Sequence, residues 1–186
     1  MILYIHGFGS SGRGFKVTQM KQWFSEQELL SPSLSYIPEL AIDTLRQLIE
    51  CLQQKEETVQ LIGSSLGGFY ALYLAEYYNL RTVLINPALN PFILLQQAIG
   101  QTRHYYDDSS FLWTEEHVKM LRKYEVDQFS YPKNVLLLVQ QFDEVLNAQD
   151  ALDKLPNANQ IIDKDGDHGY GNIDKRQYEI INFLRQ

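Results

Sequence analysis

The chain has 186 residues, of which 45% are hydrophobic and 21% are charged, as is typical of a globular protein with one domain. The formal net charge of −7 and the scattered lysines and arginines argue against nucleic acid as a partner, because nucleic-acid binders usually carry a basic stripe. Cys51 is the only cysteine, which excludes an internal disulfide, and no apolar run has the length of a membrane span.

Short β-rich runs alternate with amphipathic stretches, which predicts an α/β fold with a mostly parallel sheet of about six strands flanked by helices. The expected strands are Ile2–His6, Leu34–Ile37, Val59–Ile62, Thr82–Asn86, Val135–Val139 and Gln160–Ile162. The expected helices run over about Phe15–Gln27, Ile42–Leu52, Leu66–Tyr78 and Arg176–Leu184.

The alternation stops between Ala88 and Tyr131. There we expect two helices, around Phe92–Ile99 and Glu115–Lys123, joined by the polar and aromatic segment Gln101–Trp113. This insertion, residues 88–131, is predicted to be a helical cap within a single domain of residues 1–186. Its aromatic side chains suit the wall of an apolar pocket. The candidates for contact with substrate are Phe92, Tyr105 and Trp113.

Five residues, Gly63-Ser64-Ser65-Leu66-Gly67, read G-x-S-x-G between an expected strand and an expected helix. This context is typical of a nucleophile elbow, in which a strained serine stands at the carboxyl edge of a sheet. Only Ser65 has glycine two residues away on both sides, so Ser65 is the candidate nucleophile. The alternative is an ordinary strand-to-helix turn in which the glycines serve close packing.

An acid and a histidine follow Ser65 in the order that this kind of site requires. Asp143 comes a few residues after the apolar strand Val135–Val139, and His168 lies in the loop after the last strand. We expect His168 to take the serine proton and Asp143 to fix the histidine tautomer. Glu144 and Asp150 lie further from the strand end and are weaker candidates for the acid.

The loop after the first strand, His6–Gly12, is expected to complete the site with an oxyanion hole. Its donors would be the backbone N–H groups of Phe8 and Leu66. The same loop spells G-x-G-x-x-G, but a helix is expected where a dinucleotide fold needs its second strand. The loop Asp163–Asp174 has the rhythm of a calcium loop but lacks the required glycine and the closing glutamate. We therefore expect neither a cofactor nor a metal.

With these residues in view, the chain resembles the short bacterial YqiA-type esterases of the α/β-hydrolase superfamily over nearly its whole length. Phe142 stands where that pattern usually has glycine, which leaves open how the turn presents Asp143. The resemblance implies a Ser65–Asp143–His168 triad and hydrolysis of carboxylic esters or thioesters of small acyl groups without a cofactor. The shared motifs are His6-Gly7-Phe8 with Ser10-Ser11, Gly63 to Gly68, Asn86-Pro87-Ala88 followed by Pro91-Phe92, Gln140-Gln141, Asp143-Glu144-Val145-Leu146 and Asp167-His168.

These observations predict a compact α/β-hydrolase without the two usual antiparallel edge strands, acting as a serine esterase through an acyl-enzyme. An acyl-CoA or other thioesterase with the same triad is the alternative enzyme. A non-catalytic relative that binds a small molecule is the alternative of another class. The expected partner is a small-molecule ester or thioester, with neither nucleic acid nor a membrane. Because Met1-Ile2-Leu3 opens the chain without a basic segment, we expect no signal peptide and a cytoplasmic location.

Overall fold

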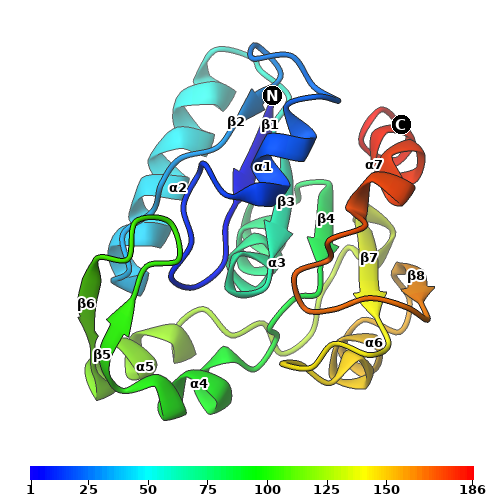
Figure 1. Cartoon of the computed structure of the whole chain (residues 1–186). Coiled ribbons are helices and arrows are strands. Elements are labelled where there is room, and N and C mark those ends of the chain that lie inside the picture. The colour runs from blue at the N-terminus through cyan, green and yellow to red at the C-terminus, as the bar shows by residue number, and fades with distance from the viewer.

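A single parallel sheet of six strands runs through the computed structural model, which describes residues 1–186 (Figure 1). The strand order is β2-β1-β3-β4-β7-β8, so the chain first builds outward on one side of β1 and then on the other. The point of reversal lies between β1 and β3, and ligands of such sheets bind beyond the carboxyl ends of the strands there. The strands are β1 (Ile2–Ile5), β2 (Leu29–Leu30), β3 (Gln60–Ser64), β4 (Thr82–Ile85), β7 (Val135–Gln140) and β8 (Asn159–Asp163).

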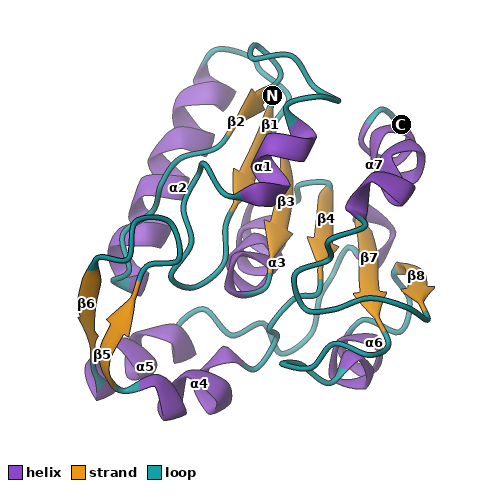
Figure 2. Cartoon of the chain, in the orientation of Figure 1, coloured by secondary structure: helices purple, strands orange, loops and turns teal.

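Helices cover both faces of the sheet (Figure 2). One face packs against α1 (Phe15–Met20) and α7 (Gln177–Leu184). The other packs against α2 (Pro38–Gln54), α3 (Leu66–Tyr78) and α6 (Ala148–Lys154). Because both faces are buried, the inner strands are continuous apolar runs rather than alternating ones, and β7 is buried at every position.

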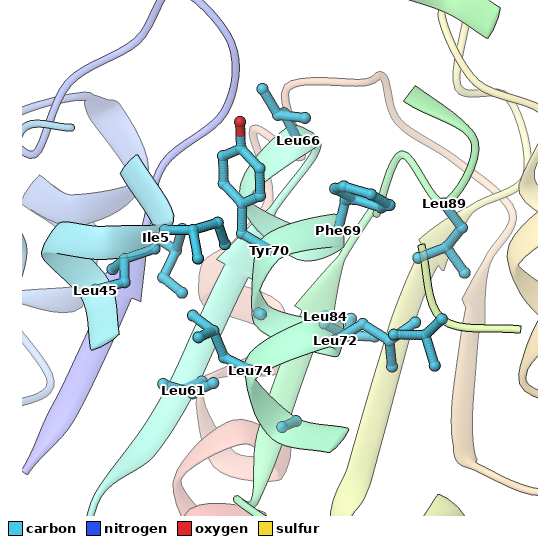
Figure 3. Packing of buried hydrophobic residues seen from close by; sticks show 14 of the residues in the cluster. Ile5, Leu45, Leu61, Leu66, Phe69, Tyr70, Leu72, Leu74, Leu84 and Leu89 are labelled. Carbon is cyan, nitrogen blue, oxygen red and sulfur yellow. The ribbon is translucent and has the colours of Figure 1, made fainter. Parts of the chain in front are cut away.

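The helix that follows Ser65, α3, is apolar on nearly all sides and is buried throughout its first two turns, Leu66–Leu72. Figure 3 shows Phe69, Tyr70, Leu72 and Leu74 of this helix among buried side chains of neighbouring elements. A helix without a polar face must be enclosed, and this enclosure fixes its first turn. The bounds predicted for this helix are confirmed.

The segment between β4 and β7 lies at the carboxyl ends of the strands and forms the cap (Figure 1). Phe111 and Trp113 of its hairpin are buried and meet Phe8 of the first loop edge-on, with ring centroids 5.6 and 4.9 Å apart. The predicted helices are present, but the hairpin between them was not predicted. The cap contains α4 (Pro91–Leu94), the 3-10 turn Leu95–Ala98, the antiparallel strands β5 (Gly100–Arg103) and β6 (Ser110–Trp113), α5 (Glu115–Arg122) and the 3-10 turn Pro132–Asn134.

Two further sequence predictions need correction. The expected strand Leu34–Ile37 is a loop, and the edge strand is instead Leu29–Leu30, which pairs with Ile2 and Leu3. The N–H of Leu34 is not available for strand pairing because it donates to Nε2 of His6. The first helix, α1, ends at Met20 rather than near Gln27.

A 3-10 turn, Ile173–Arg176, precedes α7. None of the helices combines the length and the apolar character needed to cross a membrane.

Candidate active site

Ser65 occupies the sharp turn between β3 and α3, with φ 54° and ψ −121°. A residue with a side chain rarely adopts a positive φ, and such backbone strain persists only where the surroundings enforce it. Glycine is required at positions 63 and 67 because backbone atoms of other residues lie too close for a Cβ. A Cβ on Gly63 would lie 2.3 Å from the carbonyl oxygen of Gly67, and one on Gly67 would lie 2.0 Å from that of Ile5. The G-x-S-x-G pattern therefore encodes the geometry of this turn.

A continuous chain of hydrogen bonds joins Ser65, His168 and Asp143. Nε2 of His168 lies 3.0 Å from Oγ of Ser65, and Nδ1 lies 2.8 Å from Oδ2 of Asp143. The Asp143 side chain is only 2% exposed, and its other oxygen accepts the N–H groups of Val145 and Leu146. Burial alone would raise the pKa of Asp143, but the bonds from His168 and these two amides outweigh it and lower that pKa.

The loop that carries His168 is held by two side chains from other elements. Buried Asn86, at the end of β4, donates through Nδ2 to the carbonyl oxygens of both Asp167 and His168, at 3.2 Å each. Its Oδ1 accepts the N–H of Gln140 at the end of β7. Glu144 accepts the backbone N–H of His168 at 2.9 Å. The sequence indicates for Asn86 only the end of a strand and the start of the cap, although a buried asparagine there must find polar partners.

The turn before Asp143 tolerates phenylalanine where the related pattern has glycine. Phe142 is 66% exposed and is not among the residues with positive φ. The N–H of Asp143 bonds to the carbonyl of Gln140, so the turn closes normally. Asp150 lies apart from His168, in the first turn of α6, where it accepts from Asn147.

The backbone N–H groups of Phe8 and Leu66 are the two amides expected to form an oxyanion hole. Neither donates to another group of the chain: Phe8 lies in the first loop, and Leu66 is the first residue of α3. A Cβ on Gly7 would lie 3.1 Å from Cβ of Ser65, so glycine lets the two segments approach closely without displacing the serine. His6 anchors the loop, since Nδ1 bonds to the carbonyl of Gly7 and Nε2 accepts from Leu34.

A cavity of about 680 Å³ opens over Ser65 and His168, between the first loop, α1 and the cap. Tyr105 lines it, as does the apolar side of the cap at Leu94, Leu95 and Ala98.

Two of the residues predicted to contact substrate do not line this cavity. Phe92 is buried beneath the guanidinium of Arg122, and Trp113 is fully enclosed, its Nε1 donating to the carbonyl of Leu95. Both rings pack the cap because an indole or phenyl group of this size contributes most when it is removed from water.

Two acidic side chains of the loop Asp163–Asp174 are paired with side chains close to them in the sequence. Asp163 pairs with Arg176 and accepts from the hydroxyl of Tyr170, and Asp165 pairs with Lys175 at 3.4 Å. No cluster of three or more histidine, cysteine, aspartate or glutamate side chains is placed to hold a metal ion.

The doubly wound sheet, the cap and the strained serine at the reversal point are those of the α/β-hydrolase fold class, which the solved structures below share. Within that class the chain belongs to UPF0227, an uncharacterised protein family whose model matches residues 1–185. It is similar to the UPF0227 protein YcfP of Escherichia coli O9:H4, with 27% identity over 187 residues that cover 98% of each chain. A UPF0227 protein of Shewanella oneidensis is 27% identical over 158 residues, 83% of this chain and 82% of that protein.

Solved structures show the same fold at low identity. Est1E from Butyrivibrio proteoclasticus matches with a TM-score of 0.75 at 12% identity, over 100% of this chain and 88% of that chain. Alpha/beta hydrolase domain-containing protein 10 from mouse matches with a TM-score of 0.72 at 19% identity, over 99% and 89%. These likenesses confirm the predicted fold class, whereas the roles of individual site residues stay predictions.

Proposed function

We propose that this protein is a serine hydrolase of the carboxylesterase type, cleaving esters of small to medium acyl groups through an acyl-enzyme. The observation that carries the proposal is the hydrogen-bonded chain from Ser65 through His168 to Asp143, at 3.0 and 2.8 Å, beside a largely apolar cavity. A module that only binds a small molecule has no use for a strained serine aligned on a histidine. The name of one structural relative, an esterase from Pyrococcus furiosus, agrees with this chemistry.

In the first half of the proposed reaction, Nε2 of His168 takes the proton of Ser65 while Oγ attacks the ester carbonyl. The N–H groups of Phe8 and Leu66 stabilise the charge that develops on the carbonyl oxygen, on the order of 3–4 kcal/mol for each donor. The imidazolium then gives its proton to the leaving alcohol, and the acyl group remains on Ser65. In the second half, His168 activates water, which releases the acid and restores the serine.

The lowered pKa of Asp143 supports its assignment as the triad acid. A carboxylate that stays ionised through the neutral range keeps the proton of His168 on Nδ1 and leaves Nε2 free to accept from Ser65. It also stabilises the imidazolium that forms during attack. Glu144 bonds to the backbone of His168 rather than to its ring, so it supports the loop without taking part in proton transfer.

Covalent labelling with a fluorophosphonate probe tests the proposal. The probe should modify Ser65, as mapped by mass spectrometry. In Ser65→Ala, kcat for the hydrolysis of p-nitrophenyl butyrate should fall by about 10⁴-fold or more. Ser64→Ala is the matched control from the same motif and should be labelled like the wild type. EDTA should change neither readout. Turnover by Ser65→Ala at near the wild-type rate would exclude a serine mechanism.

The cap supports a further element of the proposal, namely that it sets the acyl chain length. Its apolar wall faces the cavity over Ser65, and each buried methylene adds about 0.8 kcal/mol until the wall is reached. We expect kcat/KM to rise from acetyl to butyryl or hexanoyl esters and then to fall. Leu94 lines both this cavity and a smaller hollow of about 190 Å³, as do Gln97 and Val145, so these three residues lie between the two spaces.

Truncation of Leu94 should therefore shift the preference. In Leu94→Ala the two spaces join, and the optimum should move to longer acyl chains while Ser65 is still labelled. Leu112→Ala is the control, because Leu112 is an exposed cap leucine that lines neither space. A preference that is the same in both variants would mean that the cap does not select chain length. A butyryl thioester assayed in parallel separates esterase from thioesterase activity.

A further inference from the structure

One cation in the wall of the proposed site has no partner within the protein. Lys16, in the first turn of α1, lines the same cavity as Ser65 and His168. No carboxylate lies within 4.0 Å of its ammonium group, and the side chain makes no hydrogen bond, although it is partly buried. The ammonium group of Lys16 is therefore unpaired in a side chain that lines the cavity, where a bound molecule would lie.

The electrostatics of Lys16 fit a binding role. Burial lowers the pKa of Lys16, and the carboxylates of Asp167 and Asp143 only partly counteract this effect. Asp143 is occupied by its bonds to His168 and two amides, and Asp167 is exposed to water. A cation that has lost part of its hydration without gaining an acceptor costs free energy, and an anion that enters the cavity relieves that cost.

The two sides of the cavity differ in chemistry. On the cap side, Leu94, Leu95 and Ala98 form an apolar wall suited to a hydrocarbon chain. On the α1 side, Lys16 lines the cavity with Ser10 of the first loop. Phe15, Val17 and Asp167 line the cavity as well. A substrate that fills both sides would present a hydrocarbon part to the cap and a polar, negatively charged part to α1.

We infer that Lys16 binds an anionic group of the substrate, a carboxylate or a phosphate, and makes the enzyme selective for negatively charged esters. This inference rests on the proposed serine hydrolase function and adds the substrate class. The anion can belong to the acyl group or to the leaving group, since both halves of the ester meet at Ser65. Lys16 is a specificity residue in this scheme and takes no part in proton transfer.

Charge-matched esters test the inference. The neutral reference is phenyl hexanoate, monophenyl adipate carries the anion on the acyl half, and 3-carboxyphenyl hexanoate carries it on the leaving half. The readout is the ratio of kcat/KM for each anionic ester to that for the neutral ester. The wild type should prefer at least one anionic ester, and Lys16→Met should lower that ratio by about tenfold or more, as expected for loss of a charged hydrogen bond.

Three variants guard the interpretation. Lys16→Arg should retain much of the anion preference because it keeps the charge, and Lys16→Gln repeats the test if Lys16→Met folds poorly. Lys21→Met, which removes an exposed charge next to the end of the same helix, should leave the ratio unchanged. Wild-type discrimination against both anionic esters, or equal ratios in the wild type and Lys16→Met, would overturn the inference. Failure of the wild type to hydrolyse any of the three esters would instead count against the proposed function.

Discussion

Replacing Asp143 by asparagine tests the hydrogen-bond chain at the atom that sets the histidine tautomer. Oδ1 of Asp143 accepts two N–H groups, from Val145 and Leu146, at 2.8 Å each, while Oδ2 faces Nδ1 of His168. An asparagine has one acceptor oxygen, and the two amides fix it at the Oδ1 position. Its NH₂ group then faces His168 and donates to Nδ1.

The consequence is a histidine with its proton on the wrong nitrogen. When Nδ1 accepts from the asparagine NH₂, Nε2 must carry the proton and cannot take the one on Ser65, 3.0 Å away. A tautomer error of this kind costs about 10⁴-fold in kcat, which corresponds to about 5.5 kcal/mol. The opposite orientation of the amide would leave two backbone N–H groups facing an NH₂ group, at about 1–3 kcal/mol for each unsatisfied donor.

The assay is steady-state hydrolysis of p-nitrophenyl butyrate, with the rate of fluorophosphonate labelling as a second readout. Glu144→Gln is the matched control, because a glutamine oxygen can still accept the backbone N–H of His168. We expect Asp143→Asn to lose about four orders of magnitude in kcat and Glu144→Gln to lose less than about tenfold. A reversed pattern would refute the assignment of Asp143 as the triad acid.

Two further predictions concern the surroundings of the site. Asn86→Asp replaces the donor shared by the carbonyls of Asp167 and His168 with a repelling carboxylate, so kcat should fall at least about tenfold with little change in KM; an unchanged kcat would contradict a positioning role. The bond from Arg176 holds the pKa of Asp163 below its ordinary 3.8, although burial alone would raise it. The ion pair therefore stabilises the fold while Asp163 is ionised, and this stabilisation is lost as the pH falls below 3.8 toward the lowered pKa. Asp163→Asn should therefore lower Tm at pH 7 and flatten its decline between pH 5 and pH 3, and an unchanged slope would contradict the linkage.

The parts of the candidate site whose geometry could be predicted from the sequence are those with a local sequence signal. The turn at Ser65 needs glycine at Gly63 and Gly67 for reasons that involve only a few neighbouring atoms, and the pattern records them directly. The strand before Asp143 is apolar throughout because both faces of the sheet are covered. Chain order then placed Asp143 and His168 at the same sheet edge, where the structure brings them together.

The parts that were missed depend on tertiary contacts. The pair Leu29–Leu30 is too short to be predicted as a strand and is one through its pairing with Ile2 and Leu3. The hairpin strand Ser110–Trp113 alternates between exposed and buried positions, but exposed Leu112 hides that alternation from the sequence. The burial of Trp113 against the first loop could not be inferred, since no spacing rule connects the cap with Phe8.

The histidine loop is irregular, yet its position is determined by the elements around it. Between β8 and the 3-10 turn before α7, no ladder or helix holds the backbone that carries His168. Its carbonyl accepts from Asn86, the residue after β4. Its N–H donates to Glu144 from the loop after β7, and its ring bonds to Asp143. Three side chains from two neighbouring segments therefore orient the imidazole before any substrate is present, as electrostatic preorganisation requires. Because Asn86 also binds the end of β7 through Gln140, a disturbance at either strand end should reach the imidazole through this one buried amide.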